Sequence, residues 1–123
     1  MLAALKKAMG AHSLLSVYPS ADMDTFYVGY VCEVNERTIL MKLITTKGYE
    51  SGFSVFFTDN IQKVTMDGCY ERKIQRLLRN NGISFDALNR MPMTGSPAED
   101  LLSYARDGEK FLSVRTDFGE MLL

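Results

Sequence analysis

Four basic side chains lie close together in the stretch 71–80, "ERKIQRLLRN", and they are the strongest candidates for chemistry in this sequence. They are Arg72, Lys73, Arg76 and Arg79. The three arginines recur at i, i+4 and i+7, so a helix would place their guanidinium groups on one face, where they can contact phosphates. The alternative interpretation is an ordinary solvated face, because Ile74, Leu77 and Leu78 form an apolar stripe on the other side of the same helix.

Catalytic and metal-binding chemistry has little support in the sequence. His12 is the only histidine, which excludes a histidine-based metal cluster, and no nucleophile partner for it can be identified. Cys32 and Cys69 form no C-x-x-C pair, so neither a zinc site nor a disulfide framework is predicted. Cys69 stands at an expected helix start, which makes it a weak redox candidate beside the simpler interpretation of packing. We therefore expect no enzyme, no catalytic residue, no cofactor and no metal.

The composition is that of an ordinary globular protein. The 123 residues are 46% hydrophobic with a net charge of −1, which suits one small domain with an appendage and excludes a globally basic nucleic-acid binder. Two cysteines without a disulfide pattern are typical of a reducing cytoplasm. No apolar run approaches the roughly 20 residues that a membrane-spanning helix needs, and no signal peptide is recognisable. The expected location is the cytoplasm, without membrane contact.

The elements that would position these residues are mostly strands. The periodicity predicts a short N-terminal helix ended by Gly10, followed by five strands. The expected strands are 13–19, 25–34, 37–46, 53–58 and 61–66. A helix over 67–82 and a helical turn over 84–90 follow. A further helix is expected with Ser96 as its N-cap and Pro97 as its first residue, and Glu99 completes a predicted capping box. The fold class is therefore mostly β with flanking helices.

The second strand carries apolar residues on both faces. Alternation puts Tyr30 and Val34 on one face, and Tyr27 and Val31 on the other. This pattern is typical of a strand that bends between sheet layers or is covered by a helix on its outside. Gly29 is the expected position of the bend.

The chain divides most naturally near residue 80. Residues 1–80 are expected to form the strand-rich unit with its closing helix, and residues 81–123 a helical extension with a tail strand. The sequence Leu15-Ser16-Val17 recurs as Leu112-Ser113-Val114, each copy after a helix, so the extension is either the start of a second repeat or a chance likeness. An unpaired strand edge invites association, so we expect the tail from about Glu109 to pair with a sheet edge of its own or a neighbouring protomer.

A short helix followed by five bent antiparallel strands, with a glycine inside the second strand, resembles the Sm-like (LSm) β-barrels. The resemblance covers roughly residues 2–66. The residues that fit the first motif of that family are Gly29, Val31, Val34 and Asn35, and those that fit part of the second are Asn60, Ile61 and Val64. The resemblance implies a small five-stranded antiparallel barrel with an N-terminal helix.

The positions that hold a uridine base in that family differ in this chain. Thr38-Ile39 stands at the family's Met-Asn pair, and Phe57-Thr58 at its Arg-Gly pair. The Ile39 side chain cannot hydrogen-bond to a base edge, and Phe57 supplies a stacking face without a charge. The resemblance therefore implies the fold more than it implies uridine binding.

Two functions follow as expectations. The first is a non-enzymatic Sm-like interaction module that forms a homo-oligomer through its sheet edges or its C-terminal strand. The alternative is a protein that binds single-stranded RNA through the basic helix face, aided by Phe57 and Asn60.

Overall fold

The computed structural model describes residues 2–19, 25–108, 113–116 and 119–122, and side chains as far as residue 108. The N-terminal part contains α1 (Leu2–Ala11), β1 (Leu14–Tyr18), β2 (Tyr27–Val34), β3 (Thr38–Ile44), β4 (Glu50–Phe57), the 3₁₀ turn η1 (Thr58–Asn60) and β5 (Lys63–Met66). The C-terminal part contains α2 (Cys69–Asn80), the 3₁₀ turn η2 (Phe85–Ala87), α3 (Pro97–Asp107), β6 (Ser113–Thr116) and β7 (Gly119–Leu122). The predicted order of elements is confirmed through α3.

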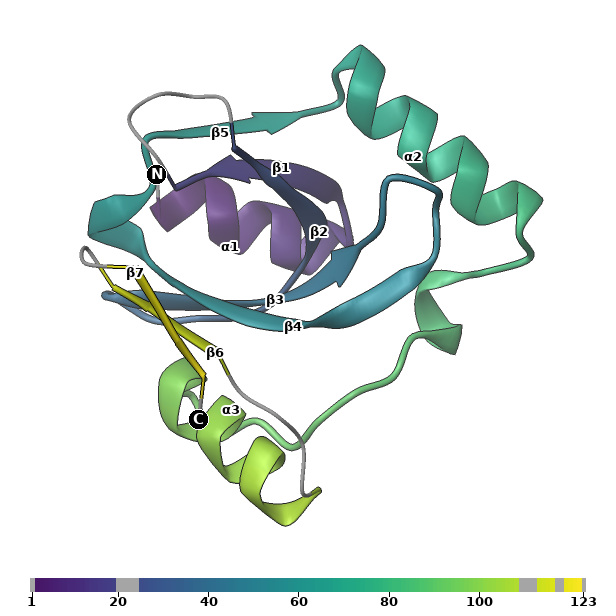
Figure 1. The fold of residues 1–123 in the computed structure, drawn as a ribbon. Helices are drawn as coiled ribbons and strands as arrows, with labels where there is room; N and C mark the ends of the chain where they lie inside the picture. Colours follow the sequence, from purple (N-terminus) through teal and green to yellow (C-terminus); the bar gives the residue numbers. More distant parts are fainter. Residues whose placement is uncertain (1, 20–24, 109–112, 117–118, 123) are drawn as a thin grey trace.

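The first five strands form one antiparallel sheet in the order β4-β3-β2-β1-β5. Figure 1 shows this sheet as strongly curved, with β4 and β5 at its two edges, and α1 packs against one of its faces. Among the described strands, β4 and β5 are not paired with each other, so the sheet does not close into the expected barrel. The five antiparallel strands and the flanking helices are confirmed.

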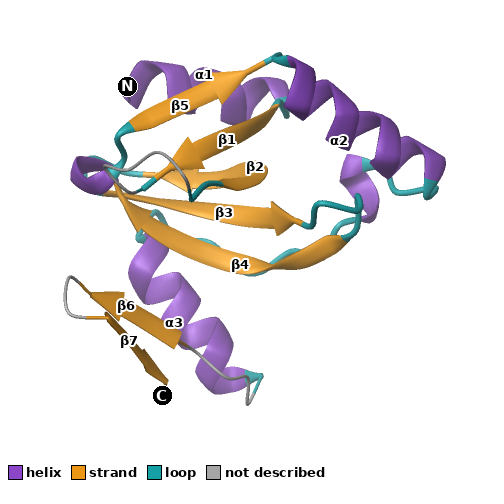
Figure 2. Ribbon diagram, turned by 45° about the horizontal axis from the view of Figure 1, so that its top comes forward, coloured by secondary structure: helices purple, strands orange, loops and turns teal. Residues whose placement is uncertain are grey.

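The sheet is covered on both faces, as the apolar residues on both sides of the second strand indicated. The face that packs against α1, here called the inner face, carries Leu15, Val17, Val31, Ile39 and Met41. The opposite, outer face carries Leu14, Val28, Tyr30 and Ile44, which pack against α2 and the segment 83–88. Figure 2 shows α2 and α3 placed at different ends of the sheet.

A bulge in β2 changes the predicted alternation. The pairing of β2 with β3 shifts between Val31 and Glu33, which makes Cys32 the extra residue. Val34 therefore packs in the inner core with Val31, and the prediction that it shares a face with Tyr30 is wrong. The glycine at position 29 has a different role from the predicted bend. A Cβ at Gly29 would collide with the backbone carbonyl of Lys42 on β3. Glycine is needed there for close approach of two strands.

The segment before α3 is anchored to β2 by polar contacts. The Thr94 N–H and hydroxyl donate to the two carboxylate oxygens of Asp100, each at 2.7 Å, and the Gly95 N–H donates to Glu33. Ser96 is the N-cap and Pro97 the first helical residue, as predicted. The predicted capping box is wrong, since the Ser96 side chain makes no cap hydrogen bond; Asp100 fixes this helix start instead.

The tail forms a hairpin of its own. β6 pairs with β7 in a separate two-stranded antiparallel sheet, so the expected pairing of the tail with an edge of its own sheet is absent from the described strands. Residues 109–112, where the tail and its repeated Leu112 were expected to begin, lie outside the described residues. Within the described part of the chain, no helix is long and apolar enough to span a bilayer.

Candidate functional site

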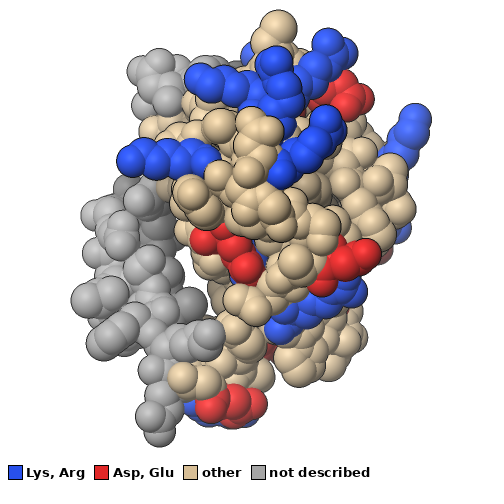
Figure 3. Space-filling model, turned by 90° about the vertical axis from the view of Figure 1, so that its right-hand side faces the viewer, with Lys and Arg blue, Asp and Glu red and all other residues tan. Residues whose placement is uncertain are grey.

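The basic face of α2 is formed as predicted. Ile74 and Leu78 are buried against the outer face of the sheet, whereas the four basic residues, Arg72, Lys73, Arg76 and Arg79, are all exposed. The ion pairs found among the described residues involve none of these four. Figure 3 shows Lys and Arg side chains gathered over the part of the surface where α2 lies. The four cations of this face therefore have no acidic partner among the ion pairs of the described residues, and they are accessible to phosphates.

The other two candidates for RNA contact lie elsewhere. Phe57 ends β4 with 55% of its surface exposed, and Asn60 is exposed in η1. Strand β5 separates η1 from the start of α2, and Figure 2 shows η1 and α2 at opposite ends of β5. The structure thus divides the six sequence candidates into a basic face on α2 and an aromatic-amide pair at the end of β4.

The edge strand β4 is partly exposed and partly covered by α3, whose Tyr104 ring contacts Phe53. It contains two adjacent exposed residues, Ser51 and Gly52, and its apolar side chains from Phe53 to Phe56 are only partly buried. At the other edge, Lys63 and Met66 of β5 are exposed. Both edges hence present strand backbone that is paired on one side only in the described structure.

A cavity of about 190 Å³ lies between the outer face of the sheet, the end of α1 and the segment 85–93. Its wall on the sheet is made by Tyr30, Cys32, Lys42 and Phe53. Most of the remaining lining is apolar and includes three methionines, namely Met9, Met91 and Met93. Ionisable side chains from β2 and β3 therefore line a largely apolar cavity.

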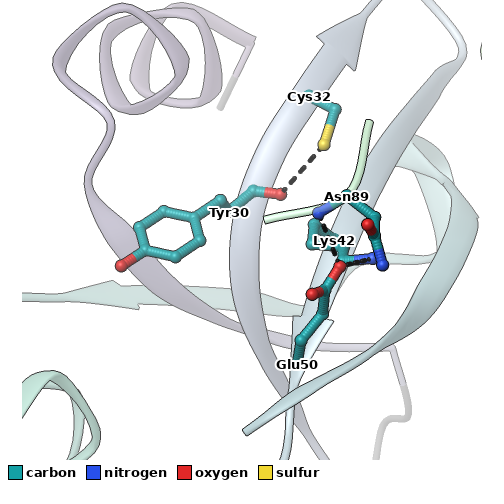
Figure 4. Close-up of polar contacts among 5 residues, drawn as sticks. All are labelled: Tyr30, Cys32, Lys42, Glu50 and Asn89. Carbon is teal, nitrogen blue, oxygen red and sulfur yellow. Dashed lines mark hydrogen bonds and ion pairs between the residues drawn. The ribbon is translucent and has the colours of Figure 1, made fainter. Parts of the chain in front are cut away.

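An ion pair stands at the sheet wall of this cavity. The Lys42 ammonium contacts Glu50 Oε1, and only 4% of the Lys42 side chain is exposed. The Lys42 Nζ also lies 4.1 Å from the ring centroid of Phe53. Glu50 accepts a further hydrogen bond from the Asn89 N–H at 2.7 Å. Figure 4 shows Lys42, Glu50 and Asn89 converging, with the Tyr30 ring directed away from them.

The pKa values of the groups in and beside the cavity follow from this arrangement. Burial acts to raise the pKa of Glu50, but the hydrogen bonds from Lys42 and Asn89 outweigh it and hold that pKa below its ordinary value. Burial raises the pKa of the Cys32 thiol, against a smaller lowering effect of Lys42, and burial also raises the pKa of Tyr30. Cys32 is thus a protonated thiol that donates weakly to the Tyr30 carbonyl at 3.8 Å.

The sequence reasoning did not single out Lys42. The signal was present in "TILMKLI", where one lysine interrupts an otherwise apolar strand, since a buried lysine requires a partner. The partner, Glu50, could not be named without the β3–β4 pairing.

His12 and Cys32 both line the cavity, and Cys69 lies at the start of α2. The His12 ring stacks on Phe85 with centroids 4.0 Å apart, and His12 has a left-handed backbone with φ of 53°. Cys69 is exposed at the start of α2, and both cysteines are free. The described part of the chain contains no group of three or more histidine, cysteine or acidic side chains that could hold a metal ion.

Comparison with known proteins gives no match: no family model, no curated protein and no solved structure corresponds to this chain.

Proposed function

We propose that this chain is a non-enzymatic Sm-like interaction module that self-associates through the two edges of its sheet. The observation that carries the proposal is the strand order, which leaves β4 at one edge and β5 at the other in a strongly curved sheet. Pairing β4 of one copy with β5 of the next would satisfy both edges and continue the sheet. Such a contact is heterologous, and successive copies form a ring when the rotation closes.

The element order supports the Sm-like part of the proposal. An N-terminal helix followed by five antiparallel strands agrees with the layout that the sequence resemblance implies, although the sheet is not closed into a barrel. The two free cysteines suit a reducing compartment, and we propose the cytoplasm.

A pair of proline variants in β4 tests the edge contact. Successive N–H groups along an edge strand point alternately to the partner strand and to the outside, so Ser54→Pro and Val55→Pro remove donors on opposite sides. The variant that removes the outward donor is expected to lower the mass measured by light scattering to that of a monomer, with little loss of melting temperature. The other is expected to lower the melting temperature, because it breaks a bond to β3.

Each variant is the control for the other, and a third protein separates the edges from the tail. If the sheet edges make the contact, a chain that ends at Gly108 is expected to keep the mass of the oligomer. If the tail makes the contact, that chain is expected to have the mass of a monomer. A monomeric wild-type chain, or a mass that neither proline changes, would contradict the proposal.

RNA binding is the second candidate function, and the uncompensated cations on α2 favour it. Affinity for single-stranded RNA is expected to fall steeply with salt, with a slope of about −0.7 per phosphate contact. Arg72→Gln with Arg76→Gln is expected to reduce that slope by roughly 1.4. Lys6→Gln with Lys7→Gln removes the same charge from the exposed side of α1 and is the matched control. Absence of binding at about 50 mM salt would exclude this function, since phosphate contacts are strongest at low salt.

A further inference from the structure

The cavity on the outer face has the size of a small ligand. Its volume of about 190 Å³ is larger than the cavity of about 150 Å³ that accepts benzene in an engineered protein, and smaller than the roughly 300 Å³ at which sites for drug-sized ligands begin. A single six-membered ring with one or two substituents therefore fits, and a nucleotide or a larger cofactor does not.

The lining favours an aromatic ring. Met9, Met91 and Met93 contribute flexible thioether side chains, which adapt to a ring and make favourable sulfur–aromatic contacts. Phe53 and Leu88 add apolar surface, and Cys32 carries a neutral thiol. Burial of an uncharged ring against these groups is favourable because it removes apolar surface from water on both sides.

Lys42 is the buried polar anchor of the cavity, and the other polar residues that line it include His12, Asn89 and Arg90. The Lys42 ammonium group has three N–H donors, whereas the ion pair with Glu50 engages one carboxylate oxygen. The ammonium can therefore donate to a further acceptor. Glu50 neutralises the charge of Lys42, and Arg90, the other cation in the lining, is paired with Asp86, so the site suits a neutral molecule.

We propose that this cavity binds an uncharged monocyclic aromatic molecule carrying one hydrogen-bond acceptor, with its ring against the methionines and its acceptor oxygen toward Lys42. The site is formed within one chain and goes beyond the self-association proposed above. Binding is therefore expected in monomer and oligomer alike.

Fluorine NMR with two matched probes tests the ligand class. 4-Fluorophenol has the acceptor oxygen and fluorobenzene lacks it. We expect 4-fluorophenol to bind about tenfold more tightly, which is the effect of one hydrogen bond to a charged donor. In the double variant Lys42→Met with Glu50→Gln the preference is expected to disappear. Equal binding of the two probes to the wild-type chain would overturn the role of Lys42.

A cavity-filling substitution tests the location. Cys32→Phe places a ring in the cavity, and Cys69→Phe adds the same ring at the exposed start of α2. We expect Cys32→Phe to weaken 4-fluorophenol binding at least tenfold and Cys69→Phe to leave it unchanged. Unchanged binding to a folded Cys32→Phe variant would overturn the proposal.

A second measurement applies even when Cys32→Phe does not fold. In the Cys69→Ser variant, Cys32 is the only thiol, and its alkylation by iodoacetamide can be followed by mass spectrometry. Saturating 4-fluorophenol is expected to slow this alkylation severalfold because it covers the thiol. An unchanged rate, at a probe concentration where NMR shows saturation, would place the probe elsewhere and overturn the proposal.

Discussion

The two faces of the sheet differ in the kinds of side chain that they bury. The inner core beside α1 consists of apolar side chains, with Leu5, Leu15, Val17, Ile39 and Met41 almost completely buried. The polar and charged side chains that are buried in the described structure belong to the other side: they lie on the outer face of a strand or on a helix packed against it. They are Ser16, Glu33, Thr38, Lys42, Glu71 and Asp100.

The partners of these polar groups explain the difference. Ser16 donates to Glu71 of α2 at 3.3 Å, Lys42 pairs with Glu50, and Glu33 accepts from Gly95 in the segment that leads into α3. Apolar packing on the inner face tolerates many arrangements of similar volume, whereas a buried polar group is satisfied in only one. Apolar packing stabilises both faces, and the polar contacts of the outer face also specify where α2 and α3 dock.

The largest expected effect comes from truncating the inner core. Leu15→Ala removes a fully buried side chain and is expected to lower the free energy of unfolding by about 3 kcal/mol, through lost burial and a residual cavity. Urea denaturation measures it. Leu102→Ala, at a residue with 52% of its surface exposed on α3, is the control and is expected to change stability by less than about 0.5 kcal/mol. A comparable loss in both variants would mean that the inner face has no special role.

Breaking the ion pair on the outer face is expected to cause a smaller loss of stability than truncating the inner core. Replacing the second partner as well is expected to restore most of that loss. Lys42→Met leaves the Glu50 carboxylate without its cation and is expected to cost about 2 kcal/mol, less than for a fully buried pair because 21% of the Glu50 side chain is exposed. Adding Glu50→Gln to Lys42→Met is expected to recover most of this loss, since the remaining groups are neutral. Urea denaturation of the two single variants and the double variant measures the coupling. Additive losses would contradict an interaction between the two side chains.

Much of the inner face could be predicted from the sequence, because it depends on local pattern. The apolar run in "TILMKLI", interrupted only by Lys42, and the spacing of Leu5 and Met9 are sufficient to place strand and helix. The bulge at Cys32 could not be predicted, since one inserted residue leaves the composition of the strand unchanged while reversing the face of Val34.

The outer face depends on polar contacts that sequence periodicity does not reveal. Asp100 replaces Ser96 as the group that fixes the start of α3, and its hydrogen bonds to Thr94 are invisible until the segment 94–100 is folded. The basic face of α2 was predictable because helical spacing alone defines it, but its separation from Phe57 and Asn60 follows from the length and direction of β5. Local periodicity was therefore sufficient to predict which residues of α2 share a face. Only the sheet order shows which other surfaces are neighbours of this face.

The smallest expected effect is a pH-dependent change in stability that comes from Glu33 on the outer face. Burial raises the pKa of Glu33, and the nearby Asp100 carboxyl raises it further, while Glu33 Oε2 is buried without a hydrogen-bond donor. A raised pKa means that the folded state favours the protonated carboxyl. The stability that Glu33 contributes is then fully present below its ordinary pKa of 4.5 and is lost as the pH rises through the folded-state value.

Glu33→Gln keeps a neutral group that can donate to Asp100 at every pH. We expect this variant to be more stable than the wild-type chain at pH 7, by about 1 kcal/mol, and the advantage to vanish as the pH falls below 4.5. Thermal and urea unfolding between pH 4 and pH 8 measure the difference. Glu36→Gln, at an exposed position in the adjacent turn, is the matched control and should show no such trend. A Glu33→Gln variant that is less stable than wild type at pH 7 would show that the ionised carboxylate is the form the fold requires. In that case the polar contacts of the outer face would include a stabilised charge at Glu33, and α3 would be held by it.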